Sequence, residues 1–102
     1  MKIELLTRNQ EQVDKLTNLV YDLIEESGLQ IIPKGGMRSK TRPIDYEISD
    51  FNLRKKKIGK YEYRLKDGVY QVKVEIEIPE IYDSLYGKIS KLYPGLLEPV
   101  GQ

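Results

Sequence analysis

Apolar and polar residues follow regular periods along most of this 102-residue chain. Residues 2–7 alternate loosely, which predicts a first strand. Apolar residues then recur three and four positions apart, and this spacing predicts an amphipathic helix over about residues 9–27. The apolar stripe of this helix consists of Val13, Leu16, Leu19, Val20, Leu23 and Ile24.

Both ends of the predicted helix carry suitable capping residues. Thr7 and Asn9 are the N-cap candidates, because each is followed three residues later by a glutamine that can help satisfy the free backbone groups. Gly28 directly follows the last turn and suits the left-handed position that ends many helices. Beyond it, residues 29–33 predict a second short strand, and residues 44–51 predict a third because apolar and acidic residues alternate there.

The clearest local signal is a hairpin. Residues 61–66 alternate, Asp67 and Gly68 form a preferred two-residue loop, and residues 69–78 alternate again. A two-residue loop fixes which residues face each other. It places three pairs on an apolar face, Leu65–Tyr70, Tyr63–Val72 and Tyr61–Val74, and two opposite-charge pairs on the other face, Glu62–Lys73 and Lys60–Glu75.

Pro79 stops this strand and fits the first position of a second helix. The apolar stripe of that helix is Ile81, Leu85, Ile89 and Leu92, with Tyr82, Tyr86 and Tyr93 beside it. Residues 96–100 predict a short last strand, placed at a sheet edge because Pro99 cannot donate to a ladder. The element order predicts a single α+β domain of the ferredoxin-like split β-α-β type, an antiparallel sheet with two helices on one face and a long basic loop.

Composition removes most kinds of catalytic chemistry. The chain has no Cys and no His, so thiolate chemistry and the commonest general base are excluded, and we expect neither an enzyme nor a cofactor. Scattered carboxylates are more typical of a solvated surface. A minor reading places Asp45, Glu47 and Ser49 on one strand face as oxygen ligands of a divalent cation, within a small hydrolase or metal-dependent enzyme. Gly35-Gly36 lacks the spacing of a phosphate loop.

The charges are strongly segregated, although the net charge is only +1. Residues 34–66 contain 11 Lys or Arg and 4 acids, whereas the rest of the chain contains 6 basic and 12 acidic residues. A basic loop (residues 34–42) and a basic run before the hairpin (residues 54–60) predict phosphate contacts with a nucleic acid, RNA above all. The candidate contacts are Lys34, Arg38, Lys40, Arg42, Arg54, Lys55, Lys56, Lys57, Lys60 and Arg64, with Lys66 assisting.

Two alternatives stay open for these segments. The basic runs are also typical of a solubilising surface, and Tyr61 and Tyr63 are interpreted as core residues rather than as platforms for stacked bases, because the hairpin register puts them on its apolar face. The rival function is a protein-interaction or structural module, for instance a homodimer formed through a sheet edge or through the face of Tyr82, Tyr86 and Tyr93.

No stretch approaches the roughly 18 consecutive apolar residues of a membrane span. The first ten residues also lack the pattern of a secretory signal, so we expect a cytoplasmic protein without a membrane partner. The heavy use of Lys, Glu, Ile and Tyr is typical of thermophile proteins.

The chain also resembles the small-subunit ribosomal protein ten family. The shared features are the opening strand IELLT, a long helix ending at Ser27-Gly28, a strand running into the basic loop LQIIPKGGMRSKTR, and the strand YQVKVEIEI followed by a helix. Only Pro33 and Thr41-Arg42 match the proline-rich segment of that family, and YEISDFNLRKKK has no counterpart there. The resemblance implies a ferredoxin-like plait whose loop residues Lys34, Arg38, Lys40 and Arg42 contact RNA backbone, and a sheet edge that can bind protein.

Overall fold

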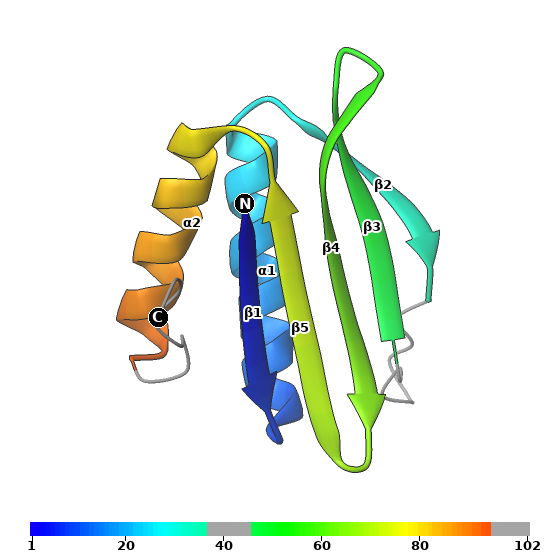
Figure 1. Ribbon diagram of the computed structural model, residues 1–102, viewed down its shortest axis with the longest axis vertical. Helices are drawn as coiled ribbons and strands as arrows, with labels where there is room; N and C mark the ends of the chain where they lie inside the picture. The colour runs from blue at the N-terminus through cyan, green and yellow to red at the C-terminus, as the bar shows by residue number, and fades with distance from the viewer. Residues whose placement is uncertain (37–45, 95–102) are drawn as a thin grey trace.

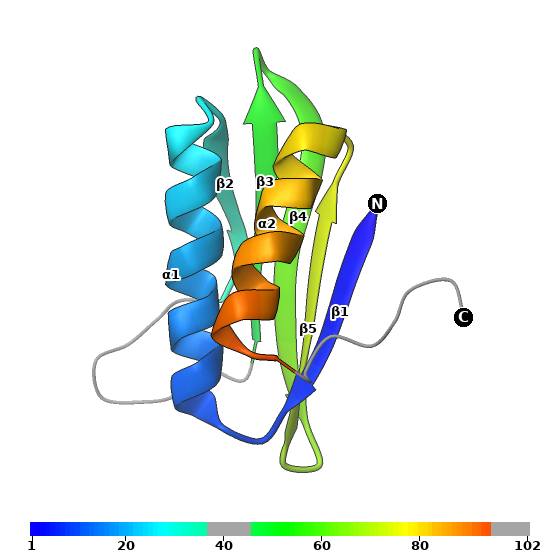
Figure 2. The same ribbon diagram turned by 90° about the vertical axis from the view of Figure 1, so that its left-hand side faces the viewer.

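The computed structural model describes residues 1–36 and 46–94, and in these ranges the chain forms a sheet covered on one face by two helices (Figures 1 and 2). The elements follow one another as β1 (Lys2–Thr7), α1 (Gln10–Glu26), β2 (Gln30–Gly35), β3 (Tyr46–Leu53), β4 (Lys56–Lys66), β5 (Val69–Ile76) and α2 (Pro79–Leu92). The strand order is β1-β5-β4-β3-β2, and every neighbouring pair is antiparallel.

The fold class α+β is confirmed, but the ferredoxin-like plait is wrong. That plait follows the order β-α-β-β-α-β, whereas here β2, β3, β4 and β5 follow one another as a meander. Residues 56–60, expected only to precede the hairpin, are the first part of β4, so β4 starts directly after a two-residue turn and pairs with β3 as a second hairpin. With that additional pairing, β1 and β2 lie at opposite edges of the sheet, and α1 crosses behind the strands between them (Figure 1).

Helix α1 starts and stops where its sequence predicts. Asn9 is the N-cap, and its Oδ1 accepts a hydrogen bond from the Glu11 amide at 2.9 Å. Thr7 supports the cap, because its Oγ1 accepts from the Asn9 amide at 3.1 Å and also contacts Gln12 Oε1. Gly28 takes a φ of +83°, the left-handed conformation expected after the last turn.

The predicted hairpin register is confirmed pair by pair. Residues of β4 and β5 face each other as Leu65–Tyr70, Tyr63–Val72 and Tyr61–Val74 on the buried side, and as Glu62–Lys73 and Lys60–Glu75 on the other. The loop has φ values of +53° at Asp67 and +76° at Gly68, as the hairpin turn with two left-handed residues requires.

The core lies between the sheet and the two helices, and it includes a row of aromatic rings. Tyr61 and Tyr63 are 0% and 3% exposed, which confirms that they are core residues. Edge-to-face contacts link the rings of Phe51, Tyr21, Tyr61, Tyr63 and Tyr70, with centroids 5.5 to 6.3 Å apart. Such pairs contribute roughly 0.5–1.5 kcal/mol each beyond their buried area.

Helix α2 begins with Pro79 at its first turn and buries Leu85 and Ile89 completely. Tyr82, Tyr86 and Tyr93 are partly buried against the core, so much of this face is already covered. The predicted strand over residues 96–100 lies outside the described residues. Neither described helix combines the length and apolar character that crossing a membrane requires.

Candidate nucleic-acid interface

Most of the predicted contact residues lie on the sheet face that the helices leave open, or at one end of it. Lys60 and Arg64 alternate with buried Tyr61 and Tyr63, so their side chains point away from the helices. Lys34 lies on β2 at the same face, as its contact with Asp50 shows. Residues 54–57 form the β3–β4 connection and the start of β4. Arg38, Lys40 and Arg42 lie outside the described residues.

Acidic residues neutralise part of this open face. Neighbouring strands place Lys2, Glu75, Lys60 and Asp50 in one row across the sheet, so positive and negative side chains alternate. Lys2 Nζ lies 3.6 Å from Glu75 Oε1. The β1 and β5 half of the face also carries Glu4 opposite Lys73, and therefore has no excess of positive charge.

The β2–β4 half of the face is different because several cations share two acids. The Asp50 carboxylate forms ion pairs with both Lys34 and Lys57. Its oxygens lie 3.8 Å from Lys34 Nζ and 3.4 Å from Lys57 Nζ. The Glu62 carboxylate forms ion pairs with Lys60, whose Nζ lies 3.4 Å away, and with Arg64, whose Nε lies 3.8 Å away. Four positive charges around two negative ones leave a net positive charge, although each cation is partly compensated.

A segment that we call the tip, residues 53–57, carries the least compensated charge. Leu53 pairs with Lys56, so Arg54 and Lys55 are the only two residues in the loop of the β3–β4 hairpin. Within the described part of the chain, Arg54, Lys55 and Lys56 make no ion pair with an acid, and all three are exposed. Figure 1 shows this connection as the green loop extending beyond the end of the sheet.

The backbone of the tip is unusual for its sequence. Arg54 and Lys55 have φ values of +52° and +68°, in the left-handed region that residues with a side chain rarely adopt. Such a two-residue turn normally contains Asn-Gly or Asp-Gly. Each left-handed residue of this kind costs roughly 1–2 kcal/mol. The turn therefore carries two cations, Arg54 and Lys55, at positions where Asn-Gly would be more stable.

The two basic segments of the sequence meet only in part. Gly36 and Tyr46, which flank residues 37–45 in the sequence, lie at the opposite end of β3 from the tip. A strand of 8 residues spans about 23 Å. Lys34 and Lys57 are the described residues through which the two segments approach each other, at Asp50.

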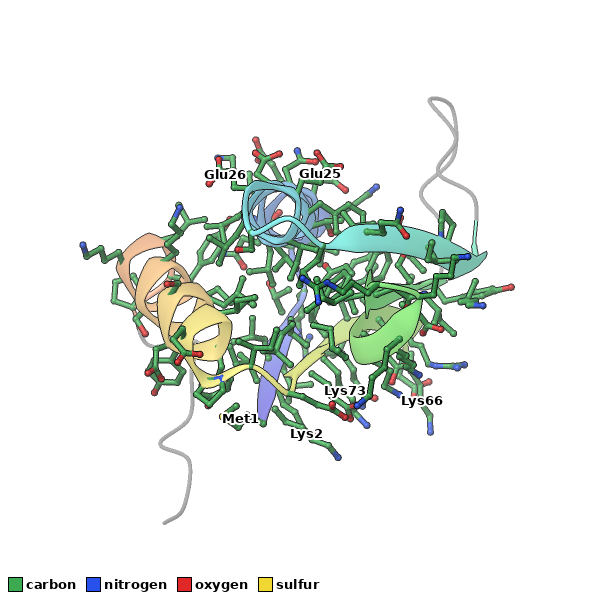
Figure 3. All side chains as sticks on the ribbon, turned by 90° about the horizontal axis from the view of Figure 1, so that it is seen from above. Met1, Lys2, Glu25, Glu26, Lys66 and Lys73 are labelled. Atoms are coloured by element: carbon green, nitrogen blue, oxygen red, sulfur yellow. The ribbon has the colours of Figure 1, made fainter. Side chains whose placement is uncertain are left out.

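The opposite layer of the molecule is acidic. Helix α1 exposes Glu11, Asp22, Glu25 and Glu26. Figure 3 shows Glu25 and Glu26 on the side of α1 that faces away from the sheet, whereas Lys2, Lys66 and Lys73 extend from the other side. The described charges are therefore polarised across the two layers, with the acids of α1 on one side and the cations of the sheet and the tip on the other.

The minor metal-site reading is not supported by the described residues, which contain no group of three potential metal ligands. Asp45 lies outside the described range. Glu47 and Ser49 face the core, where the Tyr21 hydroxyl donates to Glu47 Oε2 at 2.6 Å and lies 2.8 Å from Ser49 Oγ. These two residues anchor α1 to β3 instead of binding a cation at the surface.

Sequence reasoning missed two features of the site. Asp50 is interpreted from sequence as ordinary surface charge, but it gathers cations from both basic segments. Tyr46, 44% exposed, lies under Arg64, whose Cζ is 6.0 Å from the ring centroid. The alternation of residues 44–51 places Tyr46 on the same face as Asp50. Its contact with Arg64 could be predicted only from the pairing of β3 with β4, in which the two residues face each other.

No family model, curated protein or solved structure matches this chain. The resemblance to the small-subunit ribosomal protein ten family therefore remains a prediction.

Proposed function

We propose that this chain is a non-catalytic nucleic-acid-binding domain whose main contact with phosphate is the tip. The observation that supports this most strongly is the set of exposed cations Arg54, Lys55 and Lys56, without acidic partners among the described residues, on a projecting turn. Nucleic-acid phosphates provide a dense array of negative charge, and releasing their counterions supplies affinity that does not depend on sequence.

The paired cations form a second, weaker set of contacts. Lys34, Lys57, Lys60 and Arg64 each lie within 4 Å of a carboxylate, so a phosphate must compete with an existing partner. Exposed ion pairs contribute only about 0–1 kcal/mol, so these side chains exchange partners at small cost. Lys34 and Arg64 extend the basic surface from the tip along β2 and β4.

A titration with fluorescent ~20-residue oligonucleotides at ~50 and ~200 mM salt tests this proposal. We expect the affinity to fall steeply with salt, with a slope that corresponds to about four phosphates. The variant Arg54→Ser/Lys55→Ser/Lys56→Ser should lose at least tenfold in affinity at the lower salt. The matched control, Lys15→Ser/Lys88→Ser/Lys91→Ser, removes the same charge from exposed helix positions and should bind like the wild type. Equal losses in both variants, or no binding by the wild type, would contradict the proposal.

A second candidate function, self-association, has one specific observation in its favour. Among the described residues, no strand pairs with the outer edge of β1, and Leu6 on this strand is 59% exposed. The other edge strand, β2, contains Pro33 and an irregular register, two features that discourage pairing. Size-exclusion chromatography with light scattering tests this alternative, because a dimer that Leu6→Lys converts to a monomer would support it.

A further inference from the structure

We infer that the tip is a two-stranded ribbon that enters the major groove of double-stranded B-form DNA. This inference rests on the proposed function, since it specifies which nucleic acid the same basic element binds.

The tip has the dimensions that such a groove accepts. Pairing of β4 with β5 ends at Gly59–Ile76, and pairing of β2 with β3 ends at Gln30–Asn52. Among the described residues, residues 53–57 therefore pair only within the β3–β4 hairpin, Leu53 with Lys56 and Lys57 with Asn52. Two paired strands lie about 4.8 Å apart, and the major groove of B-form DNA, about 12 Å wide, admits a two-stranded ribbon.

The charges of the tip suit a groove lined by phosphates. Arg54 and Lys55 form the turn, and Lys56 and Lys57 follow them on β4, so the cations lie at the end of the ribbon and along one of its strands. Both walls of the groove are lined by phosphates. Arg54 at the end of the turn also offers a planar guanidinium, the group that most often contacts guanine in this groove. The ribbon can therefore contact phosphates through β4 while its turn reaches the base edges.

The base of the ribbon is held firmly by the core. Ile58, the residue that follows Lys57, is 6% exposed, and its carbonyl accepts from the Glu77 amide at 2.9 Å. Gly59 packs so closely on β5 that a Cβ there would lie 2.3 Å from the Glu75 carbonyl oxygen. A ribbon fixed in this way loses little conformational entropy on binding, which favours insertion into a groove of defined shape.

Residues 1–36 and 46–94 lack the features that single-stranded nucleic acids require. Non-specific single-strand binding combines a basic groove with exposed aromatic rings on which bases stack. Tyr61 and Tyr63 are buried, and Tyr46, the one exposed aromatic residue among those described, lies at the other end of β3 from the tip. Acids also interrupt the cations of the open sheet face, so the described residues form no continuous basic track across it.

Double-stranded RNA fits the tip poorly for a geometric reason. The major groove of A-form RNA is deep and narrow, and side chains do not reach into it. The shallow minor groove of such a duplex offers a broad surface that suits a flat face more than a narrow ribbon. Among duplexes, the tip therefore favours DNA.

The test is a competition experiment on the full chain. A labelled ~20-base-pair DNA duplex is displaced at ~100 mM salt by unlabelled duplex DNA, duplex RNA, single-stranded DNA and single-stranded RNA of one sequence. We expect duplex DNA to compete at concentrations at least tenfold lower than the other three. Methyl green, which occupies the major groove, should displace the protein, and netropsin, which occupies the minor groove, should not.

The possible failures are distinguishable. Equal or tighter binding of either RNA or of single-stranded DNA would overturn the inference but leave the proposed function intact. Displacement by netropsin alone would also overturn it. Absence of binding to all four competitors and to the labelled duplex would overturn the proposed function as well. The Arg54→Ser/Lys55→Ser/Lys56→Ser variant should lose the preference for duplex DNA, and the helix control should keep it.

Discussion

Lys34 on β2 and Lys57 on β4 contact the same carboxylate, with their Nζ atoms 3.8 Å and 3.4 Å from the two oxygens of Asp50 on the strand between them. The two basic segments of the sequence thus meet at one acid, which lowers the positive potential of the surface below the tip. Asp50 therefore limits how strongly these lysines attract phosphate.

Replacing Asp50 by Asn should release both lysines. We expect the affinity for a DNA duplex to rise several-fold and the salt dependence to steepen by about one to two phosphates. The lysines are more than half exposed, so the change in stability should stay within about 1 kcal/mol. Glu4→Gln is the control, since it removes the same charge from β1, where the facing residue is Lys73 and not a proposed contact. An unchanged salt slope in Asp50→Asn would show that these lysines do not contact the ligand.

Thr17 and Tyr61 provide a test of the packing between α1 and β4. Their hydroxyl oxygens lie 2.6 Å apart, both residues are fully buried, and Thr17 also donates to the Val13 carbonyl at 2.7 Å. Thr17→Val should therefore cost more than Tyr61→Phe, because it leaves the Tyr61 hydroxyl buried without a partner. We expect about 1–3 kcal/mol for the first and about 1 kcal/mol for the second. Urea denaturation measures both, and the double variant should cost less than their sum; a larger loss for Tyr61→Phe would contradict this geometry.

The same tyrosine predicts how stability depends on alkaline pH. Burial raises the pKa of the Tyr61 phenol above its ordinary value, and the Thr17 hydrogen bond offsets only part of that effect. The folded chain then holds this proton more tightly than the unfolded chain. Below about pH 10 the Tyr61 phenol is protonated in both the folded and the unfolded chain, so stability should not change there. Stability should fall as pH rises further. The melting temperature of Tyr61→Phe should fall less steeply between about pH 9 and 11 than that of the wild type. Parallel curves would argue against a contribution of Tyr61 to alkaline instability.

Two glycines should respond to alanine in opposite ways. Gly87 lies exposed in the middle of α2 with no atom within 4 Å of a new Cβ, so Gly87→Ala should stabilise the protein by about 0.5–1 kcal/mol. A Cβ on Gly59 would instead collide with the Glu75 carbonyl, so Gly59→Ala should destabilise by about 1–3 kcal/mol. Thermal denaturation distinguishes them, and equal effects of the two substitutions would contradict the close packing of β4 on β5.

The sequence predicted the elements whose signals are local. Asp67-Gly68 carries the preferred turn chemistry, and the alternation on both sides of it agrees with only one register, so the pairing of β4 with β5 was predictable to the residue. The same register correctly buried Tyr61 and Tyr63. Helix α1 was equally clear because its apolar period and both of its end signals agree.

The sheet order was not predictable, because it depends on a turn without a turn signature. Arg54 and Lys55 form a left-handed loop that ordinarily contains Asn or Gly, so sequence rules give no reason to start a strand at Lys56. Residues 44–51 and 61–66 were expected as strands, but no turn signal joined them as a hairpin, and the ferredoxin-like order was expected instead. The sharing of Asp50 by Lys34 and Lys57 was hidden for the same reason, since it exists only after β4 pairs with β3.

The variant Arg54→Asn/Lys55→Gly is the sharpest test of DNA binding by the tip, because it separates the shape of the tip from its charge. Asn-Gly is the preferred sequence for this turn, so the variant should fold at least as stably as the wild type. If the two cations are there to bind DNA, affinity for the duplex should fall at least tenfold, and the salt slope should lose about two phosphates. A stably folded variant that binds the duplex as tightly as the wild type would show that Arg54 and Lys55 do not bind DNA.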